Sequence, residues 1–150
     1  MKNIPCDIFL VGPLRGDSVL LRQLRIFQSG FSPDPNKEYS GYLGLNIGRL
    51  KGVAIVTHFR SNGVTAFNIP VKYRDLPRVP LSQILDQSQS EQLVEDRRTL
   101  SQNPMFYILR SEKPGSLDEG GGLITMDALD GHRWSGEELD EYMYDFNNLI

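Results

Sequence analysis

The stretch VAIVTHFRSNGVTAFNIP, residues 53 to 70, places an Asn-Gly pair between two runs rich in β-branched and aromatic residues. Asn62 and Gly63 both tolerate positive φ, and such a pair favours the type I′ turn that joins two antiparallel strands. A hairpin at this place would fix an antiparallel pairing in the middle of the chain. It therefore constrains the fold class more than any other stretch of the sequence.

Two registers of this hairpin are compatible with its turn. In a two-residue turn His58 faces Phe67, whereas in a three-residue loop with a bulge His58 faces Ala66. Neither neighbour can orient the imidazole or tune its pKa for proton transfer. We therefore interpret His58 as a structural residue of the hairpin.

The N-terminal part of the chain predicts a strand, a tight loop and a helix. The strand covers residues 8 to 12 and ends on Gly12 and Pro13. The helix begins at Asp17 or Ser18 and closes at Gly30. Its apolar stripe is flanked by two arginines whose stems we expect to cover the edge of the core; the stripe is Leu20, Leu21, Leu24 and Phe27, and the arginines are Arg22 and Arg25.

The remaining segments continue the alternation of strands and helices. Glycines recur every fourth residue from 44 to 52, so residues 39 to 52 fit an irregular strand as well as a helix. Elsewhere we expect a loop at residues 31 to 38, a helical turn at 81 to 86, a helix at 90 to 102, strands at 104 to 110 and 123 to 127, and a long loop at 111 to 122 between those strands.

The C-terminal helix has the clearest signals. Ser135 and Glu138 form a capping box, and Trp134 can staple onto Leu139. The residues that follow have the apolar spacing of one helix face, and the first turns are acidic, which suits the helix dipole. The apolar residues are Leu139, Tyr142, Met143 and Phe146, and the acidic ones are Glu137, Glu138, Asp140 and Glu141.

These elements predict an α+β fold in a single globular domain, residues 1–150. We expect a mixed or antiparallel sheet that contains the central hairpin (53–70), helices packed on one face, and a C-terminal amphipathic helix. A chain of 150 residues with 39% apolar and 23% charged side chains is ordinary for one domain. A core of this size needs no disulfide or metal for its stability.

Charge and composition exclude several classes of function. The net charge of -3 gives no field toward nucleic acid or an anionic membrane. No segment approaches the roughly 20 apolar residues of a membrane span. Cys6, His58 and His132 are scattered along the chain without paired ligands, so we expect neither a metal nor a cofactor. A cytoplasmic protein with a protein partner, or one that associates with itself, fits this composition.

The loop before the first helix is a candidate ligand-binding segment. A helix N-terminus behind a glycine-bearing loop presents backbone N–H groups to an anion, although neither of the two common phosphate-loop motifs is complete here. This loop therefore predicts a small nucleotide as the alternative ligand. The candidate residues are Gly12, Pro13, Gly16, Asp17 and Ser18.

Residues 9 to 17, FLVGPLRGD, resemble the opening strand and loop of the nucleoside 2-deoxyribosyltransferase-like enzymes. The resemblance implies a small nucleoside- or nucleotide-processing enzyme, in which this loop holds the substrate and an acidic residue at a later helix start attacks the sugar. Such an enzyme requires Gly12 and Glu138 to line one cleft. The segment WSGEELDE offers Glu138, Asp140 and Glu141 as the nucleophile, and His132 precedes the same helix.

The scarcity of other catalytic motifs favours a function of a different class. Under this hypothesis the chain is a non-catalytic binding or assembly protein, which engages another macromolecule through its sheet or helix surface.

Overall fold

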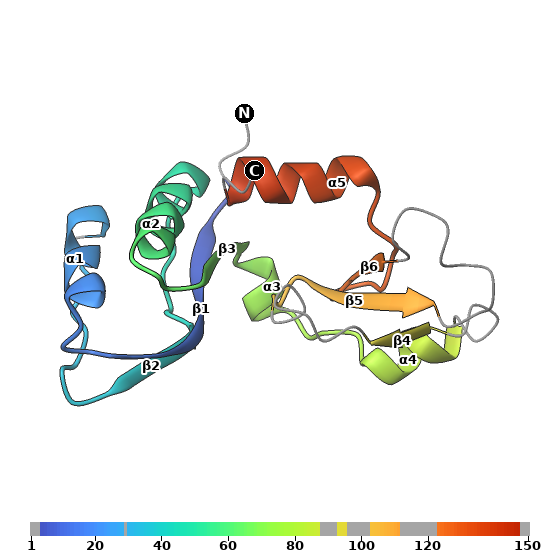
Figure 1. The fold of residues 1–150 in the computed structure, drawn as a ribbon, viewed down its shortest axis with the longest axis horizontal. Helices are drawn as coiled ribbons and strands as arrows, with labels where there is room; N and C mark the ends of the chain where they lie inside the picture. Colours follow the sequence, from blue (N-terminus) through green and yellow to red (C-terminus); the bar gives the residue numbers. More distant parts are fainter. Residues whose placement is uncertain (1–3, 29, 88–92, 96–102, 112–122, 148–150) are drawn as a thin grey trace. The chain divides into compact units, whose positions relative to one another are not determined.

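The computed structural model describes residues 4–28, 30–87, 93–95, 103–111 and 123–147. They fall into two compact units: unit 1 joins the chain up to Val71 with the part that starts at Asp140, and unit 2 is Lys72–Leu139. Both sheets are antiparallel and accompany helices, so the predicted α+β class is confirmed (Figure 1). No helix within the described ranges is long and apolar enough to cross a membrane. The single domain over residues 1–150 stays a prediction.

Unit 1 is built on a sheet with the strand order β2-β1-β3. The central strand is β1 (Cys6–Arg15), and it pairs antiparallel with β2 (Glu38–Tyr42) and with β3 (Ala66–Pro70). Phe9 of β1 lies opposite both Tyr42 and Phe67, so one face of the sheet carries these aromatic rings. The rings of Phe9 and Tyr42 meet edge to face at 5.0 Å.

The strand β1 is longer than the sequence predicted. The sequence predicts an end at Gly12 and Pro13, but the strand continues to Arg15 through an irregular step between Leu10 and Leu14. Gly12 adopts a φ of +86° there, which is a conformation that a β-bulge accepts and that suits glycine. The Gly-Pro pair therefore bends the strand and does not end it.

The helix α1 (Val19–Phe27) follows β1 as predicted. The Ser18 side chain caps it by accepting a hydrogen bond from the backbone N–H of Leu20. Leu21 and Leu24 are buried in the core of unit 1. Figure 1 shows α1 and the next helix, α2, on the same side of the sheet, and the core residues of β1 and both helices form one cluster.

The predicted hairpin over residues 53–70 is wrong, because residues 49–61 form the helix α2 (Arg49–Ser61). The buried residues of α2 are Gly52, Ile55, Val56 and Phe59, and their spacing is that of one helix face. Only the second half of the proposed hairpin is a strand, and this strand, β3, pairs with β1. The same result settles residues 39–52, which contain the end of β2 and the start of α2.

The Asn-Gly pair ends α2 and does not turn a hairpin. The backbone N–H of Asn62 donates to the carbonyl of Phe59 at 3.0 Å, and Gly63 has a φ of +79°. Glycine in the left-handed region just after a helix is a common C-terminal cap. The same two residues that favour a type I′ turn therefore serve a helix end equally well.

Unit 2 is built on a sheet with the order β4-β5-β6. Its core includes Ile84, Leu109 and Met126. The predicted strand at 123–127 is confirmed, and the predicted strand at 104–110 is found two residues later. The elements are α3 (Lys72–Asp75), α4 (Leu81–Gln87), β4 (Leu93–Glu95), β5 (Phe106–Ser111) and β6 (Leu123–Asp127).

The prediction of a helix over residues 90 to 102 is wrong at residues 93–95, the part of this segment that the structure describes. Residues 93–95 form β4, which pairs antiparallel with β5. The other residues of that predicted helix lie outside the described part of the chain, as does the predicted loop beyond residue 111. The pairing partner supplies the strand geometry here, which a helical pattern in the sequence alone does not reveal.

The C-terminal helix begins with the predicted capping box. The backbone N–H of Glu138 donates to Ser135 Oγ at 3.2 Å, and the backbone N–H of Ser135 donates to Glu138 Oε1 at 2.9 Å. The helix α5 (Gly136–Asp140) continues as the π-helical segment η4 (Glu141–Phe146), which Figure 1 draws as one helix with α5. Tyr142 and Phe146 are its buried residues.

Gly52 lets α2 approach β3 closely. A Cβ atom added at Gly52 would lie 2.0 Å from Asn68 Oδ1 and 2.4 Å from Asn68 Cγ. The Asn68 side chain has no room to retreat, because it is fully buried and donates hydrogen bonds to the carbonyls of Arg49 and Phe146. The close packing of this helix on the strand thus requires glycine.

We expect Gly52→Ala to lower the free energy of unfolding by about 2–4 kcal/mol, because it overpacks the core and disturbs buried hydrogen bonds. Urea unfolding followed by circular dichroism measures this change. Gly136→Ala is the matched control, since a Cβ at Gly136 meets nothing within 4 Å. Equal unfolding midpoints for the two variants would contradict the close-approach argument.

Candidate functional site

The predicted ligand-binding residues do not form one loop. Gly12 and Pro13 lie within β1, whereas Gly16, Asp17 and Ser18 form the turn that leads into α1. The backbone N–H of Gly16 and the side chain of Ser18 already have partners inside the protein. The N–H of Gly16 donates to the carbonyl of Lys37 at 2.8 Å, and the Ser18 side chain caps α1.

Gly16 is needed for the packing of the following loop. A Cβ added at Gly16 would lie 1.7 Å from the backbone oxygen of Asp34. The loop is also fastened to itself and to β2: the N–H of Asp34 donates to the Tyr39 hydroxyl at 2.8 Å, and the N–H of Lys37 donates to the Asp34 carbonyl at 3.1 Å. The loop therefore forms a fixed wall beside the start of α1.

A hollow of about 320 Å³ lies between this wall and α1, and we call it the arginine hollow. Only two of the predicted ligand-binding residues, Gly16 and Asp17, line it. The structure adds two arginines from α1 and a proline-bearing wall, which the sequence did not reveal as a site. The other lining residues are Arg22, Arg25, Ser32, Pro33 and Pro35.

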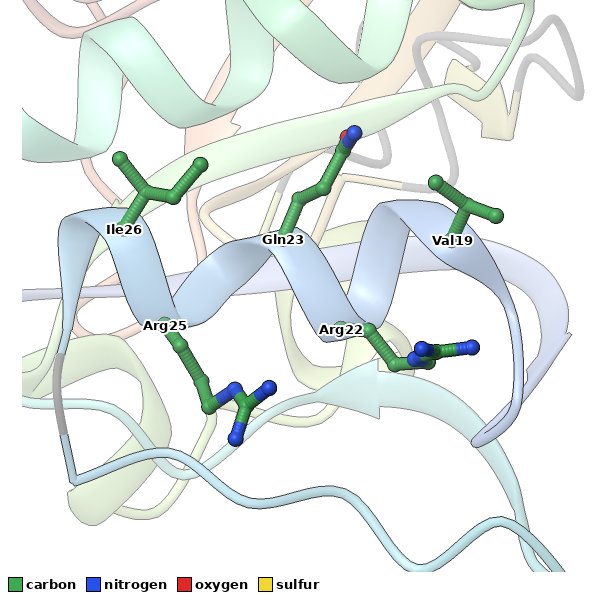
Figure 2. Close-up of a pocket in the computed structure, with 5 residues that line it drawn as sticks. All are labelled: Val19, Arg22, Gln23, Arg25 and Ile26. Atoms are coloured by element: carbon green, nitrogen blue, oxygen red, sulfur yellow. The ribbon is translucent and has the colours of Figure 1, made fainter.

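The outer face of α1 forms a second hollow, of about 420 Å³. Figure 2 shows Val19, Gln23 and Ile26 pointing to one side of the helix, and Arg22 and Arg25 to the other. Val19 is 62% exposed and Ile26 is 80% exposed. The helix thus presents an apolar stripe beside a cationic one, and the same two arginines line both hollows.

His58 lies on the helix α2 and is half-buried. Because the predicted hairpin does not form, His58 does not face Phe67 or Ala66 across a pair of strands. Its Nε2 atom lies 2.8 Å from Gln23 Oε1, so the ring joins α2 to α1. This contact supports the interpretation of His58 as a structural residue. The same contact fixes α1, which carries the exposed residues Val19 and Ile26, against α2.

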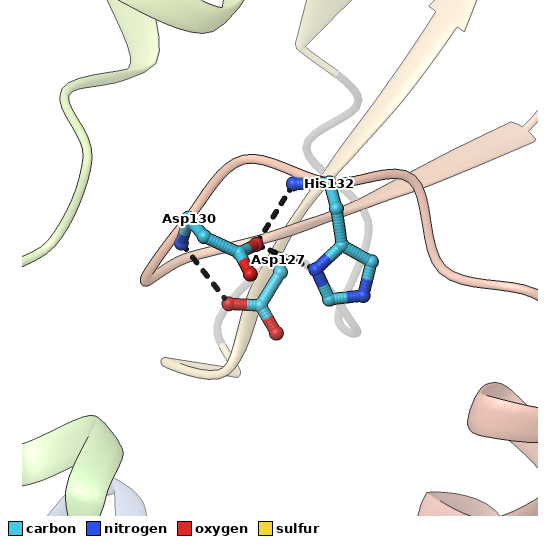
Figure 3. Close-up of side chains that lie close together, drawn as sticks. All are labelled: Asp127, Asp130 and His132. Carbon is cyan, nitrogen blue, oxygen red and sulfur yellow. Dashed lines mark hydrogen bonds and ion pairs between the residues drawn. The ribbon is translucent and has the colours of Figure 1, made fainter.

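The second candidate cluster surrounds His132 in unit 2. His132 Nδ1 lies 2.5 Å from Asp130 Oδ1, and His132 Nε2 lies 2.7 Å from Glu138 Oε2 (Figure 3 shows the Asp130 side of this contact). Desolvation opposes a charged ring, but the hydrogen bonds to Glu138 and Asp130 outweigh it and raise the pKa of His132. Hydrogen bonds from the Ser135 backbone and from His132 lower the pKa of Glu138.

Asp127 is a buried carboxylate beside this cluster, and the sequence does not single it out as a site residue. Its Oδ2 accepts hydrogen bonds from the Tyr73 hydroxyl at 2.5 Å and from Trp134 Nε1 at 2.9 Å, and its Oδ1 accepts one from the N–H of Leu129 at 2.7 Å. Burial and the bond to Asp127 raise the pKa of Tyr73 above its ordinary value. An acidic residue that ends an apolar strand was the only available signal.

Asp127, Asp130 and His132 are the one group in the described part of the chain whose ligand atoms could surround a cation, since one atom of each lies within 4.8 Å of the others (Figure 3). Carboxylate and imidazole ligands suit a divalent transition metal. Here, however, both oxygens of Asp127 accept hydrogen bonds, and His132 Nδ1 contacts Asp130. Hydrogen bonds from Tyr73, Trp134 and Leu129 therefore already occupy the oxygens of Asp127, while Asp130 and His132 contact each other.

The predicted catalytic residues are partly brought together. His132 and Glu138 are in contact, and Asp140 and Glu141 are exposed residues of α5 and η4. Gly12 belongs to unit 1 and Glu138 to unit 2. That Gly12 and Glu138 line one cleft stays a prediction.

Cys6 is unsuited to act as a nucleophile. It is fully buried, and burial raises the pKa of its thiol to about 12, so the reactive thiolate is not formed near neutral pH. Its Sγ lies 3.5 Å from the carbonyl of Ile4, to which it donates. The thiol therefore fills the core of unit 1.

Comparisons with protein-family models, with curated proteins and with solved structures found no match to this chain.

We expect Glu138→Gln to lower the pKa of His132, because the variant removes a negative charge that favours the imidazolium form. Titration of the ring signals by NMR measures it. Glu137→Gln is the control, since Glu137 is an exposed neighbour on the same helix. The idea fails if both variants shift the pKa of His132 equally.

The same contact makes stability depend on pH in a defined direction. The pKa of His132 is raised in the folded state, so its contribution to stability is present below about pH 6.5 and is lost as the pH rises through the folded pKa. The pKa of Glu138 is lowered, so its contribution is lost as the pH falls through that value. We expect the stability difference between wild type and His132→Gln to be largest between these two pKa values, as measured by urea unfolding at several pH values.

Proposed function

We propose that the protein is a non-catalytic binding protein that engages another protein through the outer face of α1. The observation that supports this most is the exposed stripe of Val19 and Ile26 beside Arg22 and Arg25. Arginine is among the residue types enriched at protein interfaces, and the fully buried centre of an interface is more apolar than the rest of the protein surface.

The apolar half of this surface has a spacing that suits a partner. One exposed apolar residue is ordinary on a protein surface, but Val19 and Ile26 lie seven residues apart on the same side of α1 (Figure 2). Seven residues correspond to roughly 10 Å along a helix axis. Two apolar side chains of a partner can therefore be seated on one helix face at the same time.

The surface is held in position before any partner binds. Leu21 and Leu24 anchor the inner side of α1 in the core, and Gln23 contacts His58 of α2. A surface that is already ordered loses less conformational entropy on binding. This favours recognition by the exposed side chains of α1.

The residues of the enzyme hypothesis support catalysis less well. Glu138 serves the capping box through one oxygen and contacts His132 through the other. A nucleophile needs an oxygen that is free to approach the sugar. The contacts of Glu138 therefore favour a structural role for this carboxylate.

We expect a photo-crosslinking amino acid at Ile26 to form a discrete adduct with another protein in extracts of the source cells, because this position lies in the proposed interface. Gel analysis and mass spectrometry of the adducts measure it. Leu50 is the matched control, since it is a 70% exposed apolar residue on α2 of the same unit.

Adducts of similar yield and identity at Leu50 and Ile26, or no adduct at Ile26, would contradict the proposed function. The variant at Ile26 should fold normally because this side chain is 80% exposed. An unchanged urea midpoint checks this.

A further inference from the structure

We infer that the partner of the α1 face is an acidic peptide segment, with carboxylates that bind Arg22 and Arg25 next to apolar residues that cover Val19 and Ile26. This inference rests on the proposed function and names the chemistry of the partner. It follows from the charge of α1, from the two hollows beside the arginines and from the rigidity of their walls.

The charge of α1 is opposite to that of the whole chain. The helix VLLRQLRIF contains two arginines and no acidic residue, whereas the chain has a net charge of -3. Within the part of the chain that the structure describes, neither guanidinium has an ion-pair partner. A complementary partner therefore brings negative charge.

The two arginines also repel each other. Like charges three residues apart on a helix destabilise it by about 0.2–0.5 kcal/mol. Arg25 lies in the last turn, where the helix dipole favours a cation, but Arg22 lies in the middle of α1. A carboxylate placed between them relieves this repulsion and forms charge-assisted hydrogen bonds with both.

Arg22 and Arg25 lie between two hollows, so one bound peptide can contact the apolar side chains and both arginines at the same time. Arg22 and Arg25 line the hollow with Val19 and Ile26, and they also line the arginine hollow. Apolar side chains of a bound segment occupy the first hollow, while a neighbouring Asp or Glu extends into the second. A peptide that alternates acidic and apolar residues meets both requirements.

The far wall of the arginine hollow is rigid. Pro33 and Pro35 have fixed φ angles, and Gly16 abuts the backbone of Asp34 between them. Asp17 also lines the hollow, but it forms an ion pair with Arg15 at 3.5 Å. The hollow therefore keeps a net positive charge and a defined shape.

A polyanion or a membrane fits these features less well than a peptide. Binding to a nucleic-acid backbone gains its affinity from many phosphate contacts, for example about 6–10 in a strongly salt-dependent complex, whereas α1 offers two cations. Membrane-surface helices bury a whole apolar face, but the inner apolar residues of α1, Leu21 and Leu24, are in the core. Two cations beside two apolar side chains match a short protein segment.

Selection from a random-peptide display library against the intact protein tests this inference. We expect the selected peptides to be enriched in Asp and Glu beside Leu, Ile or Phe. A synthetic consensus peptide, measured by fluorescence anisotropy, should lose roughly ten- to a hundred-fold in affinity with the double variant Arg22→Glu/Arg25→Glu. The control Lys51→Glu/Lys72→Glu, with the same change in net charge, should bind as wild type.

Charge exchange gives the sharpest result. A consensus peptide with Lys in place of its acidic residues should bind Arg22→Glu/Arg25→Glu and not wild type. Circular dichroism of each variant checks that it is folded.

Selected peptides that need Val19 and Ile26, but are neutral or basic and insensitive to the arginine variant, would overturn this inference and leave the proposed function intact. If no selected peptide is sensitive to Val19→Ser/Ile26→Ser, the proposed function fails as well. Wild-type binding to phosphatidylserine vesicles or to heparin that requires the arginines, without acidic peptides being selected, would replace the peptide by an anionic surface.

Discussion

Unit 1 depends on one buried amide, the side chain of Asn68 in β3. Its Nδ2 donates to the carbonyl of Arg49, at the start of α2, and to that of Phe146, near the end of the C-terminal helix. The backbone N–H of Asn68 donates to Asn147 Oδ1 at 2.8 Å. Buried polar groups that lose such partners cost about 1–3 kcal/mol each, so three distant segments are fixed together at this point. Through α2 and His58, the same interaction positions α1 and its exposed face.

The parts of the fold that the sequence predicted correctly rest on local interactions. The capping box of Ser135 and Glu138 and the cap at Ser18 involve residues a few positions apart, so their pattern is visible in the sequence. The segment 53–61 differs, because its apolar residues fit two periods and an Asn-Gly pair can end a helix or turn a hairpin. In the folded chain α2 packs closely on β3, where Gly52 meets Asn68, sixteen residues away, and no local pattern shows that contact.

The candidate site was predictable only in part for the same reason. Gly16 and Asp17 were identified from the loop before α1, and both line the arginine hollow. Arg22 and Arg25 were recognised only as flanks of the apolar stripe, since the sequence does not show that a proline-bearing loop packs opposite them. The only signal for Asp127 is its place at the end of an apolar strand, and the sequence does not show its contacts with Tyr73 and Trp134.

The order of the two units along the chain has a consequence for the covalent integrity of unit 1. The chain leaves unit 1 after Val71 and re-enters it at Asp140, so unit 2 is one continuous insertion and unit 1 is not. Proteolytic cleavage within the insertion would split unit 1 into two fragments whose cohesion relies on non-covalent contacts such as Asn68 with Asn147. Unit 1 therefore resembles a split protein. If the insertion were cut, the two fragments of unit 1 would stay together only when the end of the C-terminal helix is bound to β3.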